Sequence, residues 1–272
     1  MHRRTQDRQG AGGLVPLGPA RGGGVVWLVG AGPGDPELMT IRALNVLKGA
    51  EVVIHDGLVS QAILAMVRPG AKRISVAKRK SRHTLPQAAI QDLLVGLARQ
   101  GLRVVRLKGG DPFLFGRGGE ELEACRAAGI ECHVVPGVTA ALAAAAGAGA
   151  PLTLRGAAQA VTFVTGHAAA GAAPDLDWQS LAKTNQTVVV YMGLSTAAQI
   201  AGALMAAGRA GSTPPLIVEN ASLADERRIL TTLSGLAQAA PGLSGPALLM
   251  IGEAMALATA TPAARARERG AA

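Results

Sequence analysis

Short apolar runs alternate with amphipathic stretches through the first half of the chain. Residues 25–29 form a continuous apolar run of strand length that ends in a glycine-rich turn. Similar runs predict further strands at 51–55, 73–76, 103–107 and 131–135. Apolar residues at helical spacing predict helices beginning at residue 36, near 60–66, and over 86–100 and 118–128. Strands that alternate with helices in this way are typical of a parallel, doubly wound sheet.

Beyond Pro136 the pattern changes. The stretch 139–149 is nearly all Ala and Gly, which predicts a helix that packs very closely on its neighbours. Later strands are predicted at about 161–165, 187–191, 215–219, 227–232 and 247–251, with a helix at about 195–207. Two of these strands lack a crossover helix between them, so we expect a mixed sheet. We place a domain boundary near 136–139, which gives an N-terminal α/β domain at 25–136 and a C-terminal α/β domain at 137–258.

The composition allows two modest domains that share a cleft. Of 272 residues, 49% are hydrophobic and only 2% aromatic, so the core is built from many small side chains. The net charge is +9, and residues 1–24 and 260–272 carry more than half of it. We expect 1–24 to be a disordered leader and 259–272 a flexible tail. The mildly basic body suits an anionic small substrate, and the scarcity of aromatic residues argues against nucleic acid.

Several sequence features favour a cytoplasmic location, and the sequence predicts no metal site. Cys125 and Cys132, in a predicted helix and the following strand, lack CxxC spacing and are expected to be buried free thiols. No apolar run reaches the roughly 18 residues that a membrane span needs, and no signal-peptide pattern follows the first arginines. No cluster of His, Cys and carboxylate residues has metal-ligand spacing, so we expect no metal.

A glycine-rich turn, GAGPGDP at residues 30–36, directly follows the first predicted strand. Glycines at such a position let backbone N–H groups approach a ligand. The spacing is not GxGxxG, because Pro33 and Gly34 interrupt it, so a nicotinamide dinucleotide site is not favoured. Taken alone, the segment fits either a ligand loop or a tight structural turn.

A longer motif, LKGGDPFLFGRGGEE at residues 107–121, follows another predicted strand. It lies at the carboxyl edge of the sheet, where open α/β sheets bind ligands. A purely structural loop does not need so many glycines beside an acid and two aromatic residues. We therefore interpret Gly109 and Gly110 as admitting a ligand, with Asp111 taking a polar group.

These motifs carry a resemblance to a known family. GAGPGDPELMT (30–40) and GGDPFLFGRGGEE (109–121), followed by VPGVTA, YMG and ENA at 135–140, 191–193 and 219–221, resemble the uroporphyrinogen-III C-methyltransferases of the tetrapyrrole methylase family. The resemblance runs from about Val25 to Ala256. It implies two α/β domains with S-adenosylmethionine in the cleft between them, and it implies a homodimer.

The resemblance also implies which residues form the cofactor pocket. The first loop contributes Pro33, and the second loop contributes residues that meet the methionine part of the cofactor. Thr139 and Ala140 stand at the start of the Ala-rich helix. Residues of the second domain line the adenine side of the pocket. The implied cofactor residues are Pro33, Gly109, Gly110, Asp111, Leu114, Thr139, Ala140, Met192, Ala221 and Ala247.

Asp56 and Lys78 match positions to which the family assigns general base and general acid roles. Asp56 ends the predicted strand 51–55, which would direct its carboxylate at the cleft, and a carboxylate can accept the proton lost in a C-methylation. A turn residue before Gly57 is the alternative for Asp56. Lys78 stands in a run of charges, and a solvated surface is the alternative for it.

The implied substrate, uroporphyrinogen III, carries eight carboxylates and needs cations around it. Guanidinium and ammonium groups pair with carboxylates, and the candidates are Lys78, Arg79, Lys80, Arg82, Arg117 and Arg155. His55 and His167 are weaker candidates for substrate contacts, since hydrogen-bonded structural histidines are more common. Neither an activated serine nor a nucleophile elbow is present.

The sequence departs from the family pattern in three places. Residues 151–155 have leucine where relatives commonly have histidine, Ala77 stands where glycine is usual, and DERR at 225–228 replaces the usual glutamine after Ser222. That last segment is expected to serve packing or the dimer rather than the cofactor.

The leading hypothesis is the conversion of uroporphyrinogen III to precorrin-2 by two successive ring-carbon methylations. This step opens both sirohaem and cobalamin biosynthesis, and the sequence does not distinguish the two pathways. A later corrin-ring methyltransferase and a non-catalytic binder of the cofactor or of a tetrapyrrole are the alternatives. Nothing before Val25 has a foldable pattern, so we expect the methyltransferase alone, without a dehydrogenase or ferrochelatase region.

Overall fold

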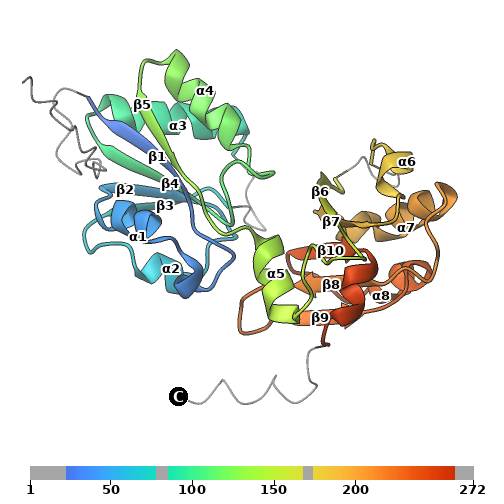
Figure 1. Cartoon of the computed structure of the whole chain (residues 1–272). Helices are drawn as coiled ribbons and strands as arrows, with labels where there is room; N and C mark the ends of the chain where they lie inside the picture. The colour runs from blue at the N-terminus through green and yellow to red at the C-terminus, as the bar shows by residue number, and fades with distance from the viewer. Residues whose placement is uncertain (1–22, 78–84, 168–173, 261–272) are drawn as a thin grey trace, which may run out of the picture.

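The computed structural model describes residues 23–77, 85–167 and 174–260. Within these ranges the chain forms two five-stranded sheets with helices packed on them. Figure 1 shows the two sheets in separate lobes, with helix α5 at the junction between them. The predicted leader and tail lie almost entirely outside the described residues. At their inner edges, Gly24 and Thr259 donate backbone hydrogen bonds to Ala98 and Ala148.

The first sheet is entirely parallel, as predicted. Its strands stand in the order β3-β2-β4-β1-β5. They are β1 (Val25–Gly30), β2 (Val52–His55), β3 (Lys72–Ser75), β4 (Arg103–Lys108) and β5 (Glu131–Val135). All six residues of β1 are buried, because the sheet is covered on both faces, and this accounts for its unbroken apolar run.

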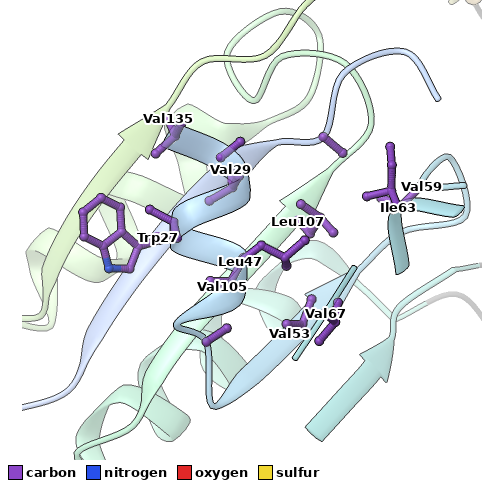
Figure 2. Close-up of a cluster of buried hydrophobic side chains, with 14 of the residues drawn as sticks. Trp27, Val29, Leu47, Val53, Val59, Ile63, Val67, Val105, Leu107 and Val135 are labelled. Carbon is purple, nitrogen blue, oxygen red and sulfur yellow. The ribbon is translucent and has the colours of Figure 1, made fainter. Parts of the chain in front are cut away.

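Helices cover both faces of the first sheet. They are α1 (Ile41–Lys48), α2 (Gln61–Ala65), α3 (Gln87–Arg99) and α4 (Gly118–Ala127). Successive side chains of a strand point to opposite faces, so Trp27 and Val29 pack with α1 and α2 (Figure 2), whereas Val26 and Leu28 pack with α3 and α4. Cys125 is buried and Cys132 half-buried on the second of these faces, and both are free thiols.

The helix predicted to begin at residue 36 is not continuous. A 3₁₀ turn at Pro36–Leu38 is capped by the Asp35 carboxylate, which accepts a hydrogen bond from the Glu37 amide. Met39 is then extended, and Thr40 caps α1 by accepting a hydrogen bond from the Ala43 amide at 3.1 Å. The prediction was wrong here because two side-chain caps begin two separate helical segments. The spacing of apolar residues indicates one helix and does not show the break between them.

The second sheet is mixed, as predicted. Its order is β6-β7-β10-β8-β9, and only β6 and β7 pair in parallel. Its strands are β6 (Ala160–Thr165), β7 (Gln186–Tyr191), β8 (Pro215–Glu219), β9 (Arg227–Leu230) and β10 (Ala247–Ile251). Antiparallel pairing lets β8 and β9 follow each other without a crossover helix.

Helix α5 (Ala140–Ala148) covers one face of the second sheet. Its residues Ala141, Ala144 and Ala148 are fully buried and pack in one cluster with side chains of β7, β8 and β10. On the other face lie α6 (Trp178–Leu181), α7 (Ala197–Ala206) and α8 (Leu236–Ala239). The four-residue helices α6 and α8 are too short to show a helical repeat in the sequence. In the described part of the chain, no helix is long and apolar enough to cross a bilayer.

Candidate active site

A cavity of about 310 Å³ lies where the two sheets meet. The loops after β2 and β4 form one wall, and loops at the ends of β7, β8 and β10 form the other. All ten residues predicted for the cofactor line it: Pro33, Gly109, Gly110, Asp111, Leu114, Thr139, Ala140, Met192, Ala221 and Ala247. Asp56 lines it as well. The chain thus brings these residues together from positions up to 214 apart in the sequence, although their roles remain predictions.

Two glycine-rich loops are joined backbone to backbone beneath the cavity. Gly32 and Gly110 exchange hydrogen bonds, with N···O distances of 3.3 and 2.7 Å. Both have positive φ angles, 78° and 67°, which favour glycine. A Cβ on Gly137 would lie 2.2 Å from the carbonyl oxygen of Gly110 and 2.8 Å from the Cα of Gly30. The glycines of these loops therefore allow three segments to meet with no side chain between them.

The Asp111 carboxylate fixes the second loop in place. One oxygen accepts a hydrogen bond from the Phe113 amide at 2.8 Å, and the other accepts one from the Gly137 amide at 3.0 Å. Asp111 therefore ties the loop after β4 to the segment that leads into α5. Asp111 also lines the cavity, so its predicted contact with a ligand stays a prediction beside this structural role.

A buried network of charges lies under the Asp56 side of the cavity. Arg106 and Lys108, alternate residues of β4, both donate to Oε1 of Glu121 on α4, at 3.1 and 3.2 Å. Glu121 is fully buried, and each cation is only 4% exposed. Burial lowers the pKa of Lys108, the charge of Arg106 lowers this pKa further, and the charge of Glu121 raises it.

Asp56 is at the surface of this network. Its Oδ2 lies 3.8 Å from Nη1 of Arg106, and its Oδ1 accepts a hydrogen bond from the Leu58 amide at 3.0 Å. The neighbouring His55 contacts the carbonyl oxygen of Asp56 through Nδ1 at 3.1 Å. Asp56 therefore combines the turn role considered for it with a carboxylate that faces the cavity.

Tyr191 joins the two walls. Its hydroxyl shares a short hydrogen bond with the Thr139 hydroxyl and accepts one from the Ala141 amide at 3.2 Å. Its ring lies 5.1 Å from that of Phe115, in the loop after β4. Burial raises the pKa of the phenol. A tyrosine of the second sheet therefore holds the start of α5 and contacts the first half across the cavity.

Strained backbone gathers around the same cavity. Besides Asn185, which lies before β7, the described non-glycine residues with positive φ angles belong to the loops after β4, β7 and β8: Phe115, Arg117, Met192, Asn220 and Ser222. Non-glycine residues in this region cost energy and concentrate at functional sites. Of these five, Phe115, Met192 and Asn220 line the cavity.

The DERR segment that departs from the family pattern shapes the loop after β8. The side-chain amide of Asn220 donates to Oδ2 of Asp225 at 2.8 Å, and the backbone amide of Ser222 donates to Oε2 of Glu226 at 2.6 Å. The Ser222 hydroxyl in turn accepts a hydrogen bond from the Asp35 amide at 3.1 Å. The segment therefore packs against the loop, as one of the two expected roles proposed, and it helps to join the halves.

Of the predicted substrate-binding cations, Arg117 and Arg155 fall in the described part of the chain, and neither lines the cavity. Lys78, Arg79, Lys80 and Arg82 lie outside the described residues. Arg117 is exposed and pairs with both carboxylate oxygens of Glu120 at 2.8 Å. Arg155 and His167 are also exposed. Among the described residues, no group of three His, Cys, Asp or Glu side chains is placed to hold a metal ion.

Sequence reasoning missed several residues of the cavity wall. The polar ones are Lys108, Tyr191 and Asn220, and the others are Leu58, Phe115, Gly116, Val218, Leu223, Pro246 and Leu248. Lys108, Phe115 and Gly116 belong to the long motif after β4, and Tyr191 and Asn220 belong to the shorter motifs at 191–193 and 219–221, so the motifs were the available signal. The remaining residues are placed by tertiary packing.

Over the described residues, the fold and the cavity define a two-lobed α/β protein with a candidate small-molecule site between unlike sheets. The sequence profile of the Tetrapyrrole (Corrin/Porphyrin) Methylases matches residues 25–237. The chain belongs to this family, as its motifs predict.

Relatives and solved structures agree with this assignment. The siroheme synthase of Chromobacterium violaceum is 52% identical over 246 residues, which are 90% of this chain and 52% of that protein. Siroheme synthase 3 of Aeromonas hydrophila is 51% identical over 239 residues, 88% of this chain and 51% of that protein. The chain therefore spans about half the length of these relatives.

Two solved structures cover nearly the same extent as this chain. The uroporphyrin-III C-methyltransferase of Thermus thermophilus, complexed with S-adenosyl homocysteine, superposes with a TM-score of 0.75 at 43% identity. The match covers 86% of this chain and 100% of that one. A cobalt precorrin-4 methyltransferase gives a TM-score of 0.76 at 29% identity, over 89% and 99% of the two chains.

Proposed function

We propose that this chain is an S-adenosylmethionine-dependent C-methyltransferase that converts uroporphyrinogen III to precorrin-2 by two successive ring-carbon methylations. The observation that carries the proposal is the cavity between the sheets, whose wall contains Asp56 together with all ten predicted cofactor residues. The relatives named siroheme synthase and the Thermus uroporphyrin-III C-methyltransferase support the substrate.

The residues of the cavity fit S-adenosylmethionine. The volume of the cavity lies at the lower end of the range for small-molecule sites. Gly110 keeps the space between its loop and the start of α5 free of a side chain, since a Cβ there would lie 4.0 Å from Thr139 and Ala140. On the opposite wall, Ala221 and Ala247 are small and apolar, which suits a flat adenine ring. We propose that the polar wall holds the methionine part and the alanine wall the adenine part.

Asp56 is the residue that we propose to move a proton. When bound, S-adenosylmethionine supplies a methyl group on a positively charged sulfur. A pyrrole carbon that gains this methyl group leaves the ring framework with a proton to lose, and the Asp56 carboxylate accepts it. Nη1 of the buried Arg106, 3.8 Å from Oδ2, positions that carboxylate at the edge of the charged network. The walls align the two reactants, which supplies much of the rate.

Lys78 is the proposed general acid, from its match to the family position. The cations that hold the substrate carboxylates are proposed among Lys78, Arg79, Lys80, Arg82, Arg117 and Arg155. We also propose domains at 25–136 and 137–258 that meet at the cavity. A homodimer is proposed from the resemblance and from exposed apolar side chains such as Ile41 and Phe113, which are 80% and 54% exposed. The free thiols fit a cytoplasmic location.

An anaerobic assay with uroporphyrinogen III and S-adenosylmethionine tests the function. Formation of S-adenosylhomocysteine and the mass of the oxidised tetrapyrrole would be followed together. A gain of two methyl groups is the expected result. Binding of the cofactor without methyl transfer would overturn the substrate assignment and direct the search to later corrin precursors.

A further inference from the structure

Lys108 is a buried ammonium group in the wall of the cavity, and the proposed reaction does not use it. Its side chain is 5% exposed and lines the cavity together with Asp56 and Gly116. A Cβ on Gly116 would lie 3.2 Å from Cε of Lys108, so the glycine leaves room for the end of this side chain. Long charged side chains are seldom this deeply buried unless they have partners on all sides.

In the described part of the chain, one atom accepts a hydrogen bond from Lys108, while the other oxygen of the same carboxylate, Oε2 of Glu121, is buried without a partner. An ammonium group has three N–H donors, and the only side-chain acceptor for Lys108 among the described residues is Oε1 of Glu121 at 3.2 Å. That oxygen also accepts hydrogen bonds from Arg106 at 3.1 Å and Gln87 at 3.2 Å. Among the residues that the structure describes, two donors of Lys108 therefore have no acceptor, next to the cavity.

The ion pairs around Lys108 leave it open to a further anionic acceptor. Two cations and two carboxylates meet here, but Arg106 and Lys108 share one oxygen of Glu121. Asp56 pairs with Arg106 at 3.8 Å. Burial and the charge of Arg106 both lower the pKa of Lys108, and the charge of Asp56 raises it. A ligand anion beside the ammonium would oppose the two lowering effects. Lys108 also directly precedes the Gly109–Asp111 turn proposed for the methionine part of the cofactor.

We propose that Lys108 is a ligand-binding residue of the cavity, and that its ammonium group donates to a carboxylate of the bound molecule. This inference rests on the proposed function, which offers two sources of the carboxylate. One is the amino-acid end of S-adenosylmethionine, and the other is a side-chain carboxylate of the tetrapyrrole. Glu121 fixes the direction of Lys108 from the opposite side.

The experiment measures cofactor binding and the kinetics with uroporphyrinogen III in the variant Lys108→Met. Calorimetry gives the Kd of S-adenosylhomocysteine and of its decarboxylated analogue, and steady-state kinetics gives KM and kcat with uroporphyrinogen III. Because Lys108→Met removes one cation from Glu121, the double variant Lys108→Met/Glu121→Gln is measured as well, so that misfolding is not mistaken for lost binding. Lys48→Met, an exposed lysine of α1, is the matched control.

If Lys108 binds the carboxylate of the cofactor, we expect both Lys108 variants to raise the Kd of S-adenosylhomocysteine by about 10- to 100-fold, the range of a charge-assisted hydrogen bond. The Kd of the decarboxylated analogue should then stay unchanged. A substrate carboxylate predicts unchanged S-adenosylhomocysteine binding and a similar rise in KM for uroporphyrinogen III, with kcat retained.

Equal losses for both cofactor analogues would overturn the proposal. Folded variants that change neither Kd nor KM would overturn it as well, since Lys108 would then bind Glu121 without contacting a ligand. Wild-type protein that binds S-adenosylhomocysteine without methylating uroporphyrinogen III would instead overturn the proposed substrate. In that case the S-adenosylhomocysteine measurements alone decide the role of Lys108.

Discussion

The parallel sheet β3-β2-β4-β1-β5 and the mixed sheet β6-β7-β10-β8-β9 both reach the cavity, but they give it unlike surfaces. The parallel sheet contributes Asp56, Lys108 and the glycine turn that ends in Asp111. The mixed sheet contributes mostly apolar side chains, such as Ala221 and Ala247.

The difference follows from how each sheet is built. Parallel strands all end at one edge, so their loops gather polar groups and backbone N–H donors at one place. The buried end of β4 also carries Arg106 and Lys108, which pair with Glu121 of α4. The mixed sheet packs against the alanines of α5, and most of the side chains that it contributes to the cavity wall are apolar. We therefore expect chemistry to depend on the first half, and close packing to govern the second.

The largest effect is expected from Asp56→Asn. Asparagine keeps an oxygen that accepts the Leu58 amide, but it does not accept a proton as a carboxylate does. Methyl transfer should fall by about 10²- to 10⁴-fold, the usual contribution of a general base, while S-adenosylhomocysteine binding is retained. Initial rates measure this, with Asp92→Asn on the outer surface of α3 as the control. Full activity in Asp56→Asn would show that the base lies elsewhere.

Gly137→Ala should disrupt the junction between the halves. The new Cβ would meet the backbone of Gly110 and Gly30, which have no side chains that can move aside. Unfolding in urea should show a loss of about 3 kcal/mol, in the upper part of the range for overpacking, together with weaker cofactor binding. Gly202→Ala, whose Cβ meets nothing within 4 Å, should be neutral or slightly stabilising. Equal stabilities of these two variants would refute the close approach.

Ala144→Leu tests the packing of the second half. Ala144 is fully buried between α5 and the mixed sheet, so a larger side chain should cost about 1–3 kcal/mol of unfolding free energy. Ala146→Leu on the exposed face of the same helix should change stability by no more than about 0.5 kcal/mol. Urea unfolding of the pair measures the difference, and tolerance of both would mean that α5 is loosely packed.

The smallest effect is expected from Tyr191→Phe. This variant removes the hydroxyl that bonds Thr139 and Ala141 but keeps the ring that contacts Phe115. We expect a loss of about 0.5–1.5 kcal/mol, measured by urea unfolding. Phe163→Leu is a useful comparison, because it changes a ring 6.3 Å from Tyr191 and leaves both hydrogen bonds in place. A Tyr191→Phe protein as stable as the wild type would remove this link between the walls.

The same contrast between the halves explains what the sequence could predict. Continuous apolar runs between helices predicted the parallel sheet, and motif residues predicted much of the cavity wall. The break before α1 was missed because it depends on side-chain caps at Asp35 and Thr40. The role of Lys108 as part of the wall was missed because a lysine at the end of a strand looks solvated. Only the tertiary fold brings Glu121 beneath it.

Hydrogen–deuterium exchange with and without S-adenosylhomocysteine would show whether the two unlike halves form one cofactor site. We expect slower exchange with the ligand both in the loop at residues 109–116 and in the loops around Met192 and Asn220. Slowing confined to one of the two halves would contradict this expectation, because the cofactor would then contact a single wall.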